Sequence, residues 1–202
     1  MAGALSIASV SAVLQDLLRN GLITNSEAAS VGDVSISALS PDRIGMGAEE
    51  SNQLNLFMYR VAPHSGLRSS VKQRVGAKED GPQDNPRLAL DLFYLLTAYG
   101  AQDFHAEILL GCAIQLLHRI PILSGDMIRR TLGSPPVRKG KSLMPPAQAA
   151  LSASGILDQI EQIKVTPQFL SFEEMSRVWS ALQARYRPSV SYQVSAVVID
   201  GS

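Results

Sequence analysis

The chain has 202 residues, 46% of them hydrophobic, and its 18 basic and 18 acidic residues cancel. This composition supplies enough apolar surface for a core, which excludes general disorder. A neutral chain also has no overall field that would draw it onto nucleic acid or anionic lipid. The length predicts one domain over residues 1–202. The lone cysteine, Cys112, cannot form an internal disulfide and is typical of a reducing cytoplasm.

The N-terminal segment is apolar but does not have the pattern of a signal peptide. Its first basic residue is Arg19, so the charged n-region is missing, and we expect no secretion by the general route. The spacing instead predicts a helix over residues 5–19, ended by Asn20-Gly21. The apolar stripe of this helix consists of Leu5, Ala8, Val10, Val13, Leu14, Leu17 and Leu18.

Two segments with alternating apolar residues, 33–39 and 52–62, are predicted to be strands. The segment PRLALDLFYLLTAYG (86–100) follows, and its two faces at period two are almost equally apolar. This pattern favours a strand covered on both faces, with a short helix as the alternative. Asp91 interrupts the run, which is too short to span a membrane because a spanning helix needs about 20 apolar residues. A buried carboxylate needs a partner, and we expect Arg60 of the neighbouring strand to be that partner for Asp91.

A helix is predicted over residues 103–118, with Asp103 as its N-cap and Pro121 beyond its end. The helix is apolar most of the way round, so we expect it to be buried on more than one side, in a core or against a partner. These apolar residues are Ile108, Leu109, Leu110, Ile114, Leu116 and Leu117.

The clearest local signal is a capping box, Ser171 with Glu174, which opens a helix predicted over residues 171–185. We expect Trp179 to be buried beneath this helix and packed on the sheet. The last element, residues 189–199, alternates like a half-buried antiparallel strand. The mixture of strands and helices lacks a βαβ rhythm, so the predicted fold is α+β, a mixed, mainly antiparallel sheet flanked by helices.

Two long polar segments, residues 63–86 and 133–146, are predicted to be loops that become ordered on assembly. They carry the basic residues that we predict as a partner interface: Arg68, Lys72, Arg74, Arg138, Lys139 and Lys141. No aromatic residues are interleaved with these charges for stacking on bases, so protein contacts are favoured over nucleic acid.

The sequence predicts no catalytic, cofactor or metal site. The GKS at 140–142 resembles the end of a phosphate-binding loop, but Pro135 occupies the position where that loop needs glycine. His105 and Cys112 are two helical turns apart, about 10 Å along the axis, and His118 is close to the opposite face. Neither pair can share a metal ion or a proton within the predicted helix. We therefore expect a protein that is not an enzyme.

Five segments occur in a fixed order along nearly the whole chain: NLFMYRV (55–61), PRLALDLFYLLTAYG (86–100), ILLGCAIQLLHRIPIL (108–123), LSFEEMSRVWSAL (170–182) and RPSVSYQVSAVVID (187–200). As an ordered set they resemble the cap, or tail-terminator, family of phage-tail-like contractile injection systems of the antifeeding-prophage and virulence-cassette type. The set is more specific than any one segment.

The resemblance implies a non-enzymatic subunit of a hexameric ring that closes the distal end of the inner tube and the sheath. The implied partners are other copies of the chain and the sheath and inner-tube proteins, without nucleic acid or membrane insertion. The implied location is the cytoplasm, within a phage-tail-like particle. The main alternative is another ring-forming tail-completion or connector protein. An enzyme and an isolated peptide-binding module are weaker alternatives. A ring subunit needs a strand edge that pairs with a neighbour, and we expect residues 189–199 to offer one unless that strand is internal.

Overall fold

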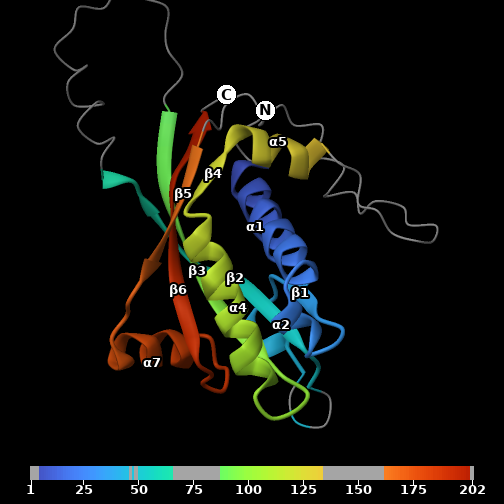
Figure 1. Ribbon diagram of the computed structural model, residues 1–202. Helices are drawn as coiled ribbons and strands as arrows, with labels where there is room; N and C mark the ends of the chain where they lie inside the picture. Colours follow the sequence, from blue (N-terminus) through green and yellow to red (C-terminus); the bar gives the residue numbers. More distant parts are fainter. Residues whose placement is uncertain (1–4, 46, 48–49, 66–86, 134–161, 201–202) are drawn as a thin grey trace, which may run out of the picture.

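The computed structural model describes residues 5–45, 47, 50–65, 87–133 and 162–200. A six-stranded sheet with the strand order β1-β2-β3-β6-β5-β4 forms its centre (Figure 1). Only β1 and β2 pair in parallel among the described strands, which confirms the predicted α+β fold with a mainly antiparallel sheet. The elements are α1 (Ser6–Ile23), α2 (Ser26–Ala29), β1 (Ser35–Ser37), a 3-10 helix (Pro41–Arg43), β2 (Gln53–Pro63), β3 (Arg87–Tyr99), α4 (His105–Arg119), β4 (Ile122–Ser124), α5 (Gly125–Gly133), β5 (Gln162–Gln168), α7 (Phe172–Ala181) and β6 (Ser189–Asp200).

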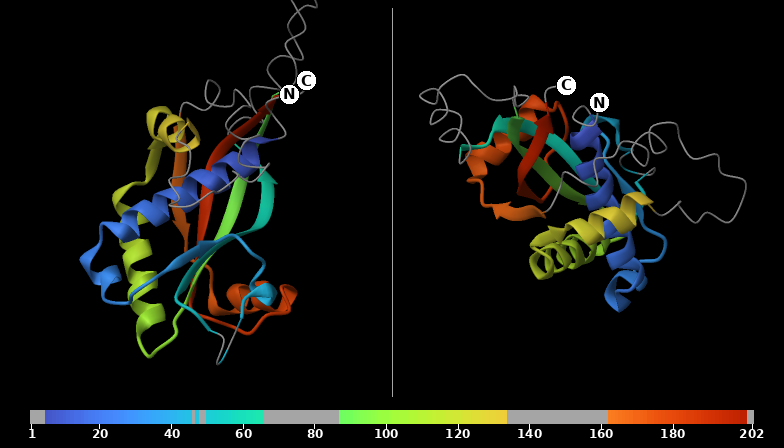
Figure 2. Two further views of the ribbon diagram at one scale, coloured as in Figure 1. Left: turned by 90° about the vertical axis from the view of Figure 1, so that its right-hand side faces the viewer. Right: turned by 90° about the horizontal axis from the view of Figure 1, so that it is seen from above.

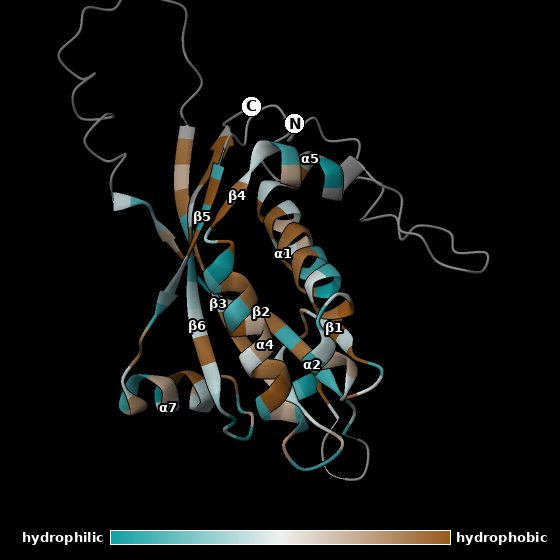
Figure 3. Cartoon of the chain, viewed as in Figure 1, coloured by the Kyte–Doolittle hydropathy of each residue, from teal (hydrophilic) through white to brown (hydrophobic). Residues whose placement is uncertain are grey.

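The apolar segment after residue 86 is a central strand, as predicted, and the alternative of a short helix is wrong. β3 pairs with β2 on one side and with β6 on the other. One face of β3 places Leu92, Tyr94 and Leu96 in the main core, beneath α1 and α4 (Figure 3). The other face places Leu95 in a smaller core beneath α7. Both faces of β3 are therefore covered, which explains why both are apolar.

α1 continues to Ile23, so the predicted end at Asn20-Gly21 is wrong. Gly21 has a different role, because a Cβ atom there would collide with the δ-methyl groups of Leu116 in α4. The glycine allows two helices to pack closely instead of ending one of them. α1 is also fixed to the sheet by a hydrogen bond of 2.8 Å between the hydroxyls of Ser11 and Tyr94.

α4 begins at His105, and Asp103 is not its N-cap. The N-cap residue is Phe104, which has a left-handed backbone with φ of 68° and no capping side chain. The buried face of α4 consists of Leu109, Cys112, Ala113, Leu116 and Leu117. Ile108, Leu110 and Ile114 are partly buried against the same core, which confirms burial over a wide part of the helix.

The capping box of α7 is formed as predicted. The Glu174 N–H donates to the Ser171 hydroxyl at 3.2 Å, and the Ser171 N–H donates to the Glu174 carboxylate at 2.8 Å. The helix ends at Ala181, earlier than the predicted residue 185. Trp179 is buried and packs with Met175 and Leu95, which confirms its predicted place between α7 and the sheet.

Candidate functional site

The predicted interface residues cannot be placed in the fold. Arg68, Lys72, Arg74, Arg138, Lys139 and Lys141 all lie outside the described residues, as do most of the two predicted loops. Their role as a partner interface stays a prediction. The surfaces that the structure does describe are the two margins of the sheet, two polar clusters at the ends of β2, and an aromatic surface around α7.

The margins of the sheet differ from the prediction. β6 lies between β3 and β5 and is an internal strand, and its residues 191–194 pair on both sides and offer no edge to a neighbour. Its side chains are correspondingly buried at Ser191, Tyr192 and Val194. The outermost strands are β1 and β4, each only three residues long. The backbone edges that a partner strand could reach are therefore the outer sides of β1 and β4 and the parts of the neighbouring strands that these short strands leave uncovered.

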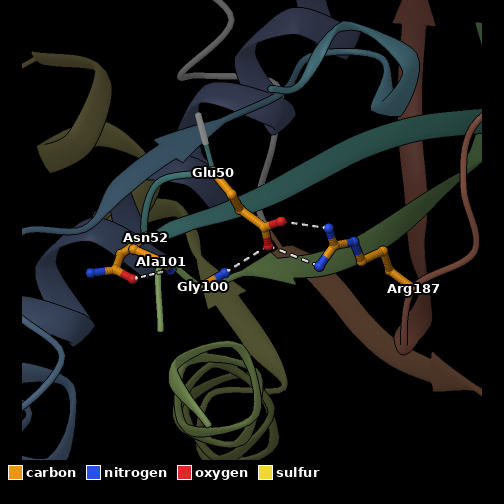
Figure 4. Close-up of polar contacts among 5 residues, drawn as sticks. All are labelled: Glu50, Asn52, Gly100, Ala101 and Arg187. Carbon is orange, nitrogen blue, oxygen red and sulfur yellow. Dashed lines mark hydrogen bonds and ion pairs between the residues drawn. The ribbon is translucent and has the colours of Figure 1, made fainter. Parts of the chain in front are cut away.

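A polar cluster joins three connections at the start of β2 (Figure 4). Arg187 lies shortly before β6 in the chain, and its guanidinium donates to both carboxylate oxygens of Glu50 at 2.8 and 2.6 Å. The Gly100 N–H, directly after β3, donates to the same carboxylate at 3.2 Å. The Arg187 guanidinium also lies over the ring of Tyr99, 5.2 Å from its centroid. The contacts fix the chain before β2 to the end of β3 and to the start of β6.

Burial and hydrogen bonding act in opposite directions on Glu50. Its side chain is only 11% exposed, and this loss of solvation disfavours the charged form. The hydrogen bonds from Arg187 and Gly100 outweigh that effect, so the pKa of the Glu50 carboxyl is lowered. The pair is thus charged at neutral pH, and its geometry is the bidentate arrangement of a structural ion pair.

Asn52 extends the cluster towards α4 and α2. Its side-chain oxygen accepts the Ala101 N–H at 2.9 Å, and its amide donates to the Val31 carbonyl at 2.9 Å. The ring of His105 lies 2.9 Å from the same oxygen through Nδ1. His105 therefore holds the turn between β3 and α4 against the start of β2.

A second polar cluster at the other end of β2 corrects the predicted partner of Asp91. Nδ1 of His64 lies 2.8 Å from the Asp91 carboxylate, which is almost completely buried. The Arg60 guanidinium instead lies 4.8 Å from the centroid of the Phe93 ring. A bulge between Met58 and Arg60 sets Arg60 opposite Phe93, whereas Asp91 is opposite Ala62. The prediction that Asp91 needs a partner is correct, but the partner follows β2 instead of lying within it.

An aromatic surface surrounds α7. Phe169 and Phe172 are 91% and 75% exposed, and Tyr186 is half exposed. The rings of Phe172 and Tyr186 are 5.8 Å apart, and Tyr186 in turn packs on Trp179 at 6.0 Å. Clustered exposed aromatic rings are typical of a surface that contacts another protein. A sequence signal exists here, because Phe169 precedes the capping box and Phe172 lies within it, and neither belongs to the apolar face of the helix.

The described residues show few groups suited to metal binding or nucleophilic catalysis. They contain no group of three or more His, Cys, Asp and Glu side chains that could hold a metal ion. Burial raises the pKa of the Cys112 thiol, and the Glu27 carboxylate raises it further, so the thiolate is disfavoured. None of the helices in the described ranges is both long and apolar enough to cross a membrane. We therefore expect function to lie in the surfaces of the described residues that could contact another protein.

Comparisons with known proteins agree with this description. The chain is similar to the sheath/tube terminator of the extracellular contractile injection system PVC in its extended state, with a TM-score of 0.55 and 16% sequence identity over 97% of this chain and 57% of that one. It is also similar to the tube-terminating cap of the anti-feeding prophage, with a TM-score of 0.47 and 16% identity over 91% of this chain and 54% of that one. It thus spans little more than half the length of either structure. No curated protein sequence matches it.

The family model of the Pvc16 N-terminal domain matches residues 9–202, nearly the whole chain. The match confirms the resemblance that the five ordered segments indicate. The shared fold with a terminator agrees with it, because the two chains superpose over almost all of this one. The chain belongs to the family of the Pvc16 N-terminal domain.

Proposed function

We propose that this chain is the cap, or tail terminator, subunit of a contractile injection system. Copies of it form a hexameric ring that closes the distal end of the inner tube and the sheath. The observation that carries the proposal is the family match over residues 9–202, and the fold shared with a sheath/tube terminator supports it. Its partners are then other copies of the chain and the tube and sheath proteins. Assembly takes place in the cytoplasm, with no nucleic acid, no membrane insertion and no catalytic step.

The physical task explains why such a subunit is needed. A stack of rings joined head to tail is an open assembly, and each added ring buries a fresh interface, so growth continues while subunits remain. A terminator must match the last ring on one side and present no copy of that surface on the other. It therefore needs separate contact surfaces for its neighbours in the ring and for the last ring of the stack. In this chain the sheet margins and the aromatic surface around α7 are such separate surfaces.

Deletion of the gene tests the proposal. We expect baseplates to remain intact, while tubes and sheaths become uncontrolled in length or fail to persist, because nothing replaces the growing end. Electron microscopy of particles from the deletion strain measures this, and a plasmid copy of the wild-type gene is the control that restores length. Particles of normal length with normally capped ends would contradict the proposal. Normal length with a missing attachment at the distal end would favour another ring-forming tail-completion or connector protein.

A further inference from the structure

Along its second half, β2 has an edge that no strand of the described residues covers; it is called the free edge of β2. Its first residues, Gln53–Asn55, pair with β1 on one side, and the whole strand pairs with β3 on the other. Beyond Asn55, no strand among the described residues pairs with the β1 side of β2. This half of β2 forms the right-hand margin of the sheet in the left view of Figure 2, where it is teal.

Two hydrogen bonds show which backbone groups point out of this edge. The Ser35 N–H in β1 donates to the Asn52 carbonyl at 3.0 Å, so even-numbered residues up to Met58 direct their N–H and C=O groups to the β1 side. The His64 N–H donates to the Ala89 carbonyl of β3 at 2.9 Å. After the bulge, therefore, Val61 directs its N–H and C=O groups away from β3. Val61 is 43% exposed.

At the opposite margin of the sheet, the outer edge of β4 is likewise unpaired among the described residues. The Val165 N–H of β5 donates to the Pro121 carbonyl at 2.8 Å, so Pro121 and Leu123 face β5. Ile122, between them, directs its N–H and C=O groups outward, and it is 47% exposed. Further along this margin the edge of β5 is closed, because Pro167 has no N–H to donate.

Neither free edge carries the usual protection against pairing. Edge strands are commonly blocked by charged side chains or by proline. The outward positions Met58 and Val61 in β2, and Ile122 in β4, carry neither. Pro63 closes the β2 edge at the last residue of that strand, and Pro121 lies directly before β4. At Val61 and at Ile122, each edge thus directs the hydrogen-bonding groups of an uncharged, branched apolar residue outward.

We propose that the free edge of β2 in one subunit pairs with the outer edge of β4 in the next subunit around the ring. A closed ring of identical chains with head-to-tail contacts requires two different, complementary patches on each chain. Opposite margins of one sheet meet this requirement, because strand addition joins them through backbone hydrogen bonds. The contact places Val61 beside Ile122 at the junction. The inference rests on the proposed ring and identifies the surfaces that form it.

Proline substitutions at the two edges test the pairing. Val61→Pro and Ile122→Pro each remove one outward N–H, and a proline is tolerated where the N–H of an edge strand faces solvent. Val61→Thr and Ile122→Thr are the matched controls, because they keep the N–H and a β-branched side chain. We expect the wild-type chain and both threonine variants to form rings in analytical ultracentrifugation. Each proline variant should keep the wild-type circular dichroism spectrum and associate at least tenfold more weakly than the wild type, so that it forms no rings at concentrations where the wild type does.

A mixture of the two proline variants separates the proposed contact from other contacts. The Val61→Pro chain keeps an intact β4 edge, and the Ile122→Pro chain keeps an intact β2 edge. Their mixture should therefore form heterodimers and nothing larger, which also shows that both chains are folded. Rings formed by either proline variant at the concentrations where the wild type forms them would overturn the edge pairing and leave the proposed function standing. A wild-type chain that stays monomeric at every concentration would contradict ring formation, and with it both proposals.

Discussion

Trp179→Ala should destabilise the protein by about 3 kcal/mol, the lower end of the range for truncating a buried tryptophan. Trp179 is 2% exposed and belongs to the small core beneath α7, with Leu95 and Met175. Two features of this site reduce the loss. The half-exposed Tyr186 covers the indole and can collapse into the cavity. The indole N–H has no hydrogen-bond partner among the described residues, so its removal relieves an unfavourable burial.

Urea unfolding followed by circular dichroism measures this loss, because the chain has a single tryptophan and the variant loses its fluorescence signal. For a chain of this size the loss corresponds to a fall in Tm of about 6–12 °C. Trp179→Phe is the matched control, since it keeps a buried ring and removes the unpaired N–H, and it should cost about 1–2 kcal/mol, because it leaves a smaller cavity than alanine does. A change below about 1 kcal/mol in Trp179→Ala would refute the packing argument.

Two further predictions concern contacts between distant parts of the chain. Glu50→Gln should cost about 2 kcal/mol at pH 7, between the values for exposed and buried ion pairs, because Arg187 keeps its charge with no carboxylate beside it. Folding lowers the pKa of Glu50 from its ordinary 4.5, so this stability is present above pH 4.5 and is lost as the pH falls through the lower, folded pKa. Urea unfolding measured from pH 7 to pH 3 should therefore show the free energies of unfolding of wild type and variant converging. A constant difference between them would contradict the pairing. Gly21→Ala should destabilise by about 1 kcal/mol, because overpacking against Leu116 exceeds the gain in helix propensity. In a Leu116→Ala background the same change should become stabilising, and destabilisation in both backgrounds would argue against the close contact.

The elements that the sequence predicts well are those whose signal is local and repeated. β3 carries apolar residues at nearly every position from Leu88 to Ala98, with Asp91 and Thr97 as the exceptions, so its burial on both faces follows from period two alone. The start of α7 follows from one side-chain motif, Ser171 with Glu174. β4 is different, because three residues are too few to show any period. β5 contains Pro167, which argues against a strand unless the residue lies at an edge.

Contacts between residues far apart in the chain could not be predicted. Glu50 and Arg187 are 137 residues apart, and neither position has a local pattern that points to the other. The partner of Asp91 depends on a bulge in β2, which shifts the register of Arg60 without any glycine or proline to mark it. Gly21 has the local appearance of a helix end, and only the neighbouring Leu116 shows why glycine is needed within the helix.

If the ring contact lies along β2, the two polar clusters would hold both ends of this strand to its own sheet. A strand that joins two subunits is pulled away from its own sheet whenever the ring is loaded. β2 is held against this at both ends by side chains as well as by its pairing with β3. At its start Glu50 is fixed to Gly100 and Arg187, and at its end His64 is fixed to Asp91. Buried hydrogen-bonded side chains contribute little net stability, but a group left without its partner is costly, so these contacts suit a place where the strand must not separate from its sheet. The free edge between the two clusters can then join a neighbour without loosening the fold that carries it.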